Sequence, residues 1–132
     1  MIEDILKSVK NIAVYGMSKN ISKAAYTVPM YMKRNGFNII PINPTTDEIG
    51  GMKCYRRLAD VEEHIDMLNV FRPSEMSVDI VNEAIERKNT NSDIDVIWFQ
   101  LGIMSKEAKE LAEKEGFTYI EDKCIYIEFN EL

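Results

Sequence analysis

Short runs of apolar residues alternate along this chain with longer segments whose apolar positions recur at helical spacing. The apolar runs are predicted as buried strands at residues 11–15, 37–42, 66–71, 95–99 and 117–121. Helices are expected over residues 1–9, 22–35, 75–88 and 106–115, with a helical turn at 59–63. This alternation predicts an α/β fold of three layers, in which helices cover both faces of a mainly parallel five-stranded sheet. The length fits one domain, residues 1–132.

Three segments depart from this regular pattern. Pro29 falls inside the second predicted helix, where its missing N–H predicts a kink or a later helix start. Residues 47–58 are expected to form a loop around two adjacent glycines, with one short extended piece at 53–55. After the fifth strand, residues 124–129 are expected to form a short extended tail.

Charge and cysteine content narrow the partners that the chain is expected to have. The formal net charge is −6 at pH 7 and lysine and arginine form no cluster, so a nucleic-acid partner is not expected. No run of 18 apolar residues occurs, which argues against a membrane span. The two cysteines, Cys54 and Cys124, lie far apart and have no metal-binding spacing. Two thiols in an ordinary domain indicate a reducing, cytoplasmic location.

The turns that follow the predicted strands are where we expect a ligand site. In a doubly wound sheet, ligands bind beyond the carboxyl ends of the strands. Five turns should therefore line one rim of the molecule, namely residues 16–20, 43–45, 71–73, 100–102 and 122–124. The only histidine, His64, precedes the third strand, so we expect it at the opposite edge of the sheet, as a surface residue.

The first of these turns has the features of a phosphate site. Gly16 at the strand end lets a ligand approach the backbone closely, and the N–H groups of the following helix start point at the anion. Hydroxyl donors and positive charge are expected from Ser18, Ser22, Lys19 and Lys23. The alternative is that Gly16 only permits a tight turn between strand and helix.

The same turn argues against two common nucleotide sites. Its sequence, G-M-S-K-N-I, matches neither the G-x-G-x-x-G of dinucleotide binders nor the lysine loop of nucleoside triphosphatases. Asn43 ends the second strand, where NAD binders place an acidic residue for the ribose hydroxyl. NAD, ATP and GTP are therefore not the ligands that this sequence predicts.

Taken in order, the turns resemble those of the CoA-binding domain family, which includes small stand-alone proteins and the amino-terminal domain of the succinyl-CoA synthetase alpha subunit. The matching segments are V-Y-G-M-S at 14–18, I-P-I-N-P at 40–44, G-x-K-C-Y at 51–55, V-F-R-P at 70–73, W-F-Q-L-G at 98–102 and D-K-C at 122–124. Each segment alone is weakly specific, but their order and spacing over nearly the whole chain are fairly specific.

The resemblance implies a Rossmann-type, flavodoxin-like domain that holds coenzyme A at the strand ends. It implies that the turn of Gly16, Met17 and Ser18 holds the pyrophosphate. Asn43 and Pro44 would contact the adenosine end and its 3′-phosphate. The adenine and pantetheine contacts would come from Phe71, Arg72 and Pro73, and those bordering the thiol end from Gln100, Leu101 and Gly102.

The chain departs from the family pattern at two positions. Thr45 stands where many relatives carry a lysine, so Lys23 or Lys53 would have to bind the 3′-phosphate instead. Met17 occupies a position where the family has glycine or alanine, and we expect it to crowd the turn slightly.

The sequence thus predicts a domain that binds coenzyme A or an acyl-CoA, with no evident catalytic residues. The synthetases use a phosphorylated histidine from a region beyond this domain, and His64 is not expected near the ligand. Two alternatives stay open. One is a thiol-redox protein in which Cys124 forms a mixed disulfide with coenzyme A, and the other is an enzyme that acts on acyl-CoA. A homodimer and an enzyme partner are both compatible with the sequence.

Overall fold

The computed structural model describes all residues, 1–132, and its centre is one five-stranded sheet. The sheet strands are β1 (Asn11–Tyr15), β2 (Asn38–Ile42), β5 (Met67–Val70), β6 (Val96–Phe99) and β7 (Thr118–Ile120). Their order across the sheet is β2-β1-β5-β6-β7, and every neighbouring pair is parallel. The five predicted strands and the parallel sheet are therefore confirmed.

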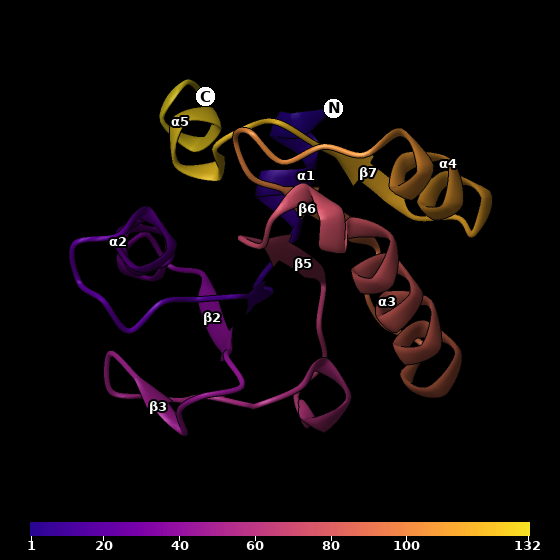
Figure 1. Ribbon diagram of the computed structural model, residues 1–132. Helices are drawn as coiled ribbons and strands as arrows, with labels where there is room; N and C mark the ends of the chain where they lie inside the picture. The colour runs from indigo at the N-terminus through magenta and orange to yellow at the C-terminus, as the bar shows by residue number, and fades with distance from the viewer.

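Helices cover both faces of this sheet, as Figure 1 shows. The helices are α1 (Ile2–Ser8), α2 (Ala24–Arg34), α3 (Ser77–Asn91), α4 (Lys106–Lys114) and α5 (Ile125–Asn130). One apolar core lies under α3 and α4, and a second lies under α1, α2 and α5. The predicted three-layer, flavodoxin-like architecture is confirmed. None of these helices is both long enough and apolar enough to cross a membrane.

Successive side chains along each strand point to opposite faces of the sheet, so they enter the two apolar cores in turn. In β1, Ile12 and Val14 face the α2 side, while Ala13 faces the α3 side. In β6, Trp98 is fully buried on the α2 side, which confirms its predicted place in the core, and its indole N–H donates to the Lys123 carbonyl at 2.8 Å. Because both faces are covered, these strands are apolar at almost every position.

The segment between β2 and β5 contains a small hairpin that the sequence did not predict in this form. Strands β3 (Glu48–Ile49) and β4 (Met52–Lys53) pair antiparallel around the two glycines. A short 3₁₀ helix, η1 (Leu58–Asp60), replaces the expected helical turn at 59–63, and another, η2 (Ser74–Met76), precedes α3. A single bridge between Ile42 and Tyr55 brings this segment back beside the end of β2.

The predicted extended tail at 124–129 is wrong, because this segment forms helix α5. The alternating Ile125-Tyr126-Ile127 suits a strand by propensity alone. Tertiary packing favours the helix instead. Ile125 is fully buried, and the Phe129 ring lies edge-on to the Phe37 ring, with 5.6 Å between the ring centroids.

Helix α2 begins at Ala24, two residues later than expected, and contains Pro29. Proline has no N–H, so it cannot donate to the carbonyl four residues earlier, which belongs to Ala25. In this structure the Ala25 carbonyl instead accepts a hydrogen bond from the Ser18 N–H at 3.1 Å. The proline therefore leaves an acceptor for the loop that precedes the helix.

Candidate functional site

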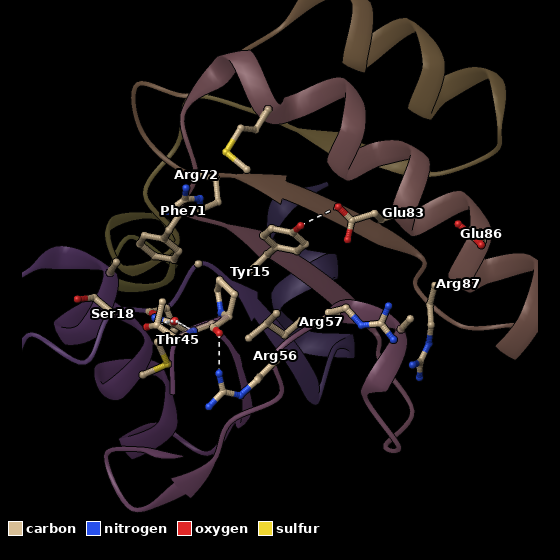
Figure 2. Close-up of a pocket in the computed structure, with 18 of the residues that line it drawn as sticks. Tyr15, Ser18, Thr45, Arg56, Arg57, Phe71, Arg72, Glu83, Glu86 and Arg87 are labelled. Atoms are coloured by element: carbon tan, nitrogen blue, oxygen red, sulfur yellow. Dashed lines mark hydrogen bonds between the residues drawn. The ribbon is translucent and has the colours of Figure 1, made fainter. Parts of the chain in front are cut away.

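A large cavity opens where the order of the strands reverses. Strand β2 lies on one side of β1 and β5 on the other, so the chain leaves β1 and β5 in opposite directions. Such a switch point is where open α/β sheets bind ligands. The cavity has a volume of about 1020 Å³ and runs from the carboxyl ends of β1 and β2 along the flank of α3. Figure 2 shows most of the residues that line it.

The turn after β1 needs a glycine for two separate reasons. Gly16 has φ +91°, in the left-handed region that favours glycine. A Cβ at this position would lie 2.6 Å from Arg72 Cδ and 3.1 Å from the Phe71 carbonyl oxygen. The turns after β1 and β5 therefore approach each other so closely that only glycine fits between them.

The start of α2 presents unpaired amide groups beside this turn. Lys23 precedes the helix and caps it with no side-chain hydrogen bond. The N–H groups of Ala24 and Ala25 donate to no backbone or side-chain acceptor, and Ala25 lines the cavity. Free amides at a helix start, together with the helix dipole, attract an anion such as a phosphate.

Asn43 joins the turn after β2 to the turn after β1. Its Nδ2 donates to the Met17 carbonyl at 2.9 Å, and its Oδ1 accepts from the Thr45 N–H at 2.8 Å. The Met17 side chain, which we expected to crowd the turn slightly, is fully buried in the core on the α2 side. The two turns thus form one rigid wall of the cavity.

Five cationic side chains line the cavity: Lys23, Arg56, Arg57, Arg72 and Arg87. Of these, Lys23 and Arg72 take part in no ion pair, and both are exposed. Arg56 pairs with Asp47 at 2.9 Å, and this contact lowers the pKa of that carboxyl. The unpaired charges therefore gather around the glycine turn, in a protein whose net charge is −6.

The flank of α3 gives the cavity a different character. Tyr15 donates its hydroxyl to Glu83 Oε2 at 2.7 Å, as Figure 2 shows. Burial, followed by this hydrogen bond to a carboxylate, raises the pKa of the Tyr15 hydroxyl. Glu86 also lines this end, while Arg87 is buried against Asp93 at 2.9 Å. Carboxylates make this end unsuitable for a phosphate.

The structure brings eight of the fourteen predicted site residues to the cavity. These are Gly16, Met17, Ser18, Lys23, Asn43, Pro44, Phe71 and Arg72. The residues that lie outside it are Lys19, Ser22, Lys53, Pro73, Gln100 and Gly102.

Among the residues outside the cavity, several side chains are used elsewhere. Gln100 is buried, and its Oε1 accepts from Asn69 Nδ2 at 3.2 Å and from the Ile125 N–H at 3.0 Å. Ser22 donates its hydroxyl to Asn20 within the loop. Gln100 therefore holds the start of α5 and does not line the cavity.

Sequence reasoning missed the adjacent arginines Arg56 and Arg57, which line the cavity. They belong to none of the turns at the ends of the predicted strands, where the ligand site was expected. The bridge between Ile42 and Tyr55 carries them to the end of β2. The sequence feature that could have pointed to them is the pairing of two adjacent arginines in an otherwise acidic chain.

The two cysteines and the histidine lie outside the cavity. Cys54 is buried, and burial raises the pKa of its thiol. Cys124 is half-buried at the start of α5. His64 lies at the amino edge of the sheet, as predicted, where its carbonyl accepts from Asn11 at the start of β1.

A match to the CoA binding domain family extends over residues 10–130. The chain belongs to this family. The Bacillus subtilis protein YneT is 36% identical over 126 residues, which cover 96% of this chain and 90% of YneT. The family assignment confirms the resemblance carried by the strand-end turns.

The family also occurs within longer proteins. The ADP-forming acetate–CoA ligase of Methanocaldococcus jannaschii is 30% identical over 121 residues. These residues cover 89% of this chain but only 17% of the ligase. The chain is thus similar to one portion of that enzyme.

Solved structures agree with the fold. The Thermus thermophilus protein known as cell-free ID.343 superimposes with a TM-score of 0.90 at 29% identity, covering 98% of this chain and 95% of that one. A hypothetical protein from Pyrococcus horikoshii OT3 superimposes with a TM-score of 0.91 at 28% identity, covering 99% and 89%. The architecture is therefore shared over the whole domain.

Proposed function

We propose that this protein binds coenzyme A or an acyl-CoA in the cavity at the carboxyl ends of β1 and β2, without itself catalysing a reaction. The observation that carries the proposal is the glycine turn at Gly16. There the close approach of Arg72, the free amides at the start of α2 and the unpaired charge of Lys23 meet around one open space. These groups suit a diphosphate, which needs several donors and positive charge at short range.

The rest of the ligand would follow the cavity wall. The diphosphate occupies the turn after β1, and the adenosine end lies against the turn of Asn43, Pro44 and Thr45. Phe71 offers an aromatic face beside this turn. Glu83 and Glu86 disfavour phosphate at the α3 end, so the charged part of the ligand has one orientation.

Binding without turnover is supported by the side chains that face the cavity. They include no cysteine and no histidine, and the Tyr15 hydroxyl is tied to Glu83. Its raised pKa makes the more nucleophilic tyrosinate harder to form, so this hydroxyl is a poor nucleophile.

Isothermal titration with coenzyme A, acetyl-CoA, NAD and ATP tests the proposal. We expect coenzyme A and acetyl-CoA to bind with similar affinity, because the acyl group is remote from the diphosphate turn. NAD and ATP should bind at least about tenfold more weakly, because they do not carry the pantetheine arm. Binding of NAD or ATP without binding of coenzyme A would overturn the proposal.

A further inference from the structure

Arg56 is held beside the turn that follows β2 by two hydrogen bonds. Its Nε donates to Asp47 Oδ1 at 2.9 Å, and its Nη1 donates to the Pro44 carbonyl at 2.9 Å, the contact drawn in Figure 2. The side chain remains 50% exposed and lines the cavity. The guanidinium is therefore fixed in place while part of it still faces the ligand space.

This anchoring leaves donors free for a ligand. A guanidinium carries five N–H groups in a planar fork, and the two anchoring bonds use one from each of two nitrogens. The remaining N–H groups suit the oxygens of a phosphate, which arginine binds in a fork geometry. Because the side chain is already ordered, less conformational entropy is lost when it binds a ligand.

We infer that Arg56 binds a phosphate on the ribose of the ligand, and that this phosphate is the 3′-phosphate of coenzyme A. The inference rests on the proposed function, which places the diphosphate at Gly16. In sheets of this kind the ribose lies at the end of the second strand, so a ribose phosphate comes close to the turn after β2. Arg56 is anchored on that turn through Pro44.

The residues that the sequence offered for this role are used or placed elsewhere. The Thr45 hydroxyl donates to Asn43 Oδ1 at 2.7 Å, within its own turn. Lys53 lies outside the cavity and pairs with Glu62 at 3.4 Å. Lys23 stands at the start of α2, beside the diphosphate turn. Of the lysines that the sequence offered, neither lies at the turn after β2.

The test compares coenzyme A with dephospho-CoA, which differs only by the 3′-phosphate, by isothermal titration. We expect the native protein to bind coenzyme A at least about tenfold more tightly. Arg56→Gln should lose this preference by weakening coenzyme A alone, with dephospho-CoA affinity unchanged within about twofold. Lys53→Gln, which removes the same charge outside the cavity, should keep the preference.

A second variant distinguishes the loss of a phosphate contact from a general disturbance of the loop by the loss of Arg56. Adding Thr45→Lys to Arg56→Gln places a cation on the same turn and should restore at least part of the preference for coenzyme A. Thermal unfolding of each variant checks that the fold is intact.

The possible outcomes separate the inference from the proposed function. Equal binding of both ligands by the native protein, or equal weakening of both by Arg56→Gln, overturns the role of Arg56 while coenzyme A binding stands. Failure of both ligands to bind overturns the proposed function as well. Binding of NADP, whose phosphate is on the ribose 2′-oxygen, in place of coenzyme A would assign Arg56 to a different ribose phosphate and contradict the inference.

Discussion

Arginines line both ends of the cavity, but the protein uses them in opposite ways. At the α3 end, Arg87 is buried and paired with Asp93, and its Nη2 also donates to the Glu63 carbonyl at 3.0 Å. At the turn after β5, Arg72 is exposed and forms no ion pair. The first arginine satisfies the protein itself, and the second is available to a ligand.

The difference shows how one residue type can serve stability or binding within a single cavity. A buried charge must have its partners within the fold, because water cannot reach it. An exposed charge is solvated by water, so leaving it unpaired costs the protein little stability, and the charge stays available to bind an anion. Changes at the α3 end should therefore lower stability, and changes at the glycine turn should lower affinity.

The largest effect is expected from Asp93→Ala, which leaves Arg87 buried without its carboxylate. We expect the free energy of unfolding to fall by about 3 kcal/mol. Urea denaturation followed by circular dichroism measures this change. An exposed pair on the same protein, Arg57 and Asp60, provides the control, because Asp60→Ala should cost less than about 1 kcal/mol. Similar losses in the two variants would contradict the comparison.

A smaller loss of stability, joined to a large loss of affinity, is expected from Gly16→Ala. The left-handed φ costs about 1–2 kcal/mol, and the added Cβ displaces Arg72 from the turn. Coenzyme A affinity should fall at least about tenfold. Gly36→Ala is a matched control, because Gly36 has φ +100° and open space around it. That variant should lose only the stability that the left-handed φ costs, and no affinity; a loss of affinity there would argue that strain alone weakens binding.

An effect on affinity alone is expected from Arg72→Gln. Removal of one charge-assisted contact should weaken coenzyme A binding about tenfold and leave the unfolding midpoint nearly unchanged. Binding should also depend less on salt than in the native protein. Lys114→Gln, at the exposed end of α4, removes the same charge far from the turn and should bind normally. An equal loss of coenzyme A affinity in both variants would indicate that the net charge of the protein matters, and not a contact made by Arg72.

The smallest effect is expected at the cysteines, which test where the cavity ends. Burial and a raised thiol pKa predict that Cys54 reacts with a thiol reagent at pH 8 at least about tenfold more slowly than Cys124. Since Cys124 does not line the cavity, Cys124→Ser should leave coenzyme A affinity unchanged. Strong protection of Cys124 by the ligand, or a mixed disulfide with it, would extend the site to α5 and favour the thiol-redox alternative.

Much of the fold follows from local pattern, and the exceptions have physical causes. The five buried strands are continuous apolar runs, so their existence and order along the chain were predictable. Helix α5 was not, because its Ile and Tyr residues favour a strand locally. Only the packing of Phe129 against Phe37 makes the helix the better solution.

The site was predictable where it depends on strand ends. Gly16, Asn43 and Arg72 follow predicted strands, and all three line the cavity, as expected for turns at the strand ends. Gln100 also follows a strand, yet its side chain turns inward to Asn69, a polar residue that β5 buries and that needs a partner. Arg56 comes from a segment between strands, so only the tertiary structure brings it to the cavity.

The most direct test of the account is an NMR titration of the labelled protein with coenzyme A, followed at each backbone amide. We expect the largest shifts at Gly16, Ala24, Ala25 and Thr45, and at Arg72. The amides of residues 86–91, at the paired end of the cavity, should move much less. Shifts confined to residues 86–91, or no shifts at the glycine turn at saturating ligand, would contradict the claim that this turn holds the diphosphate.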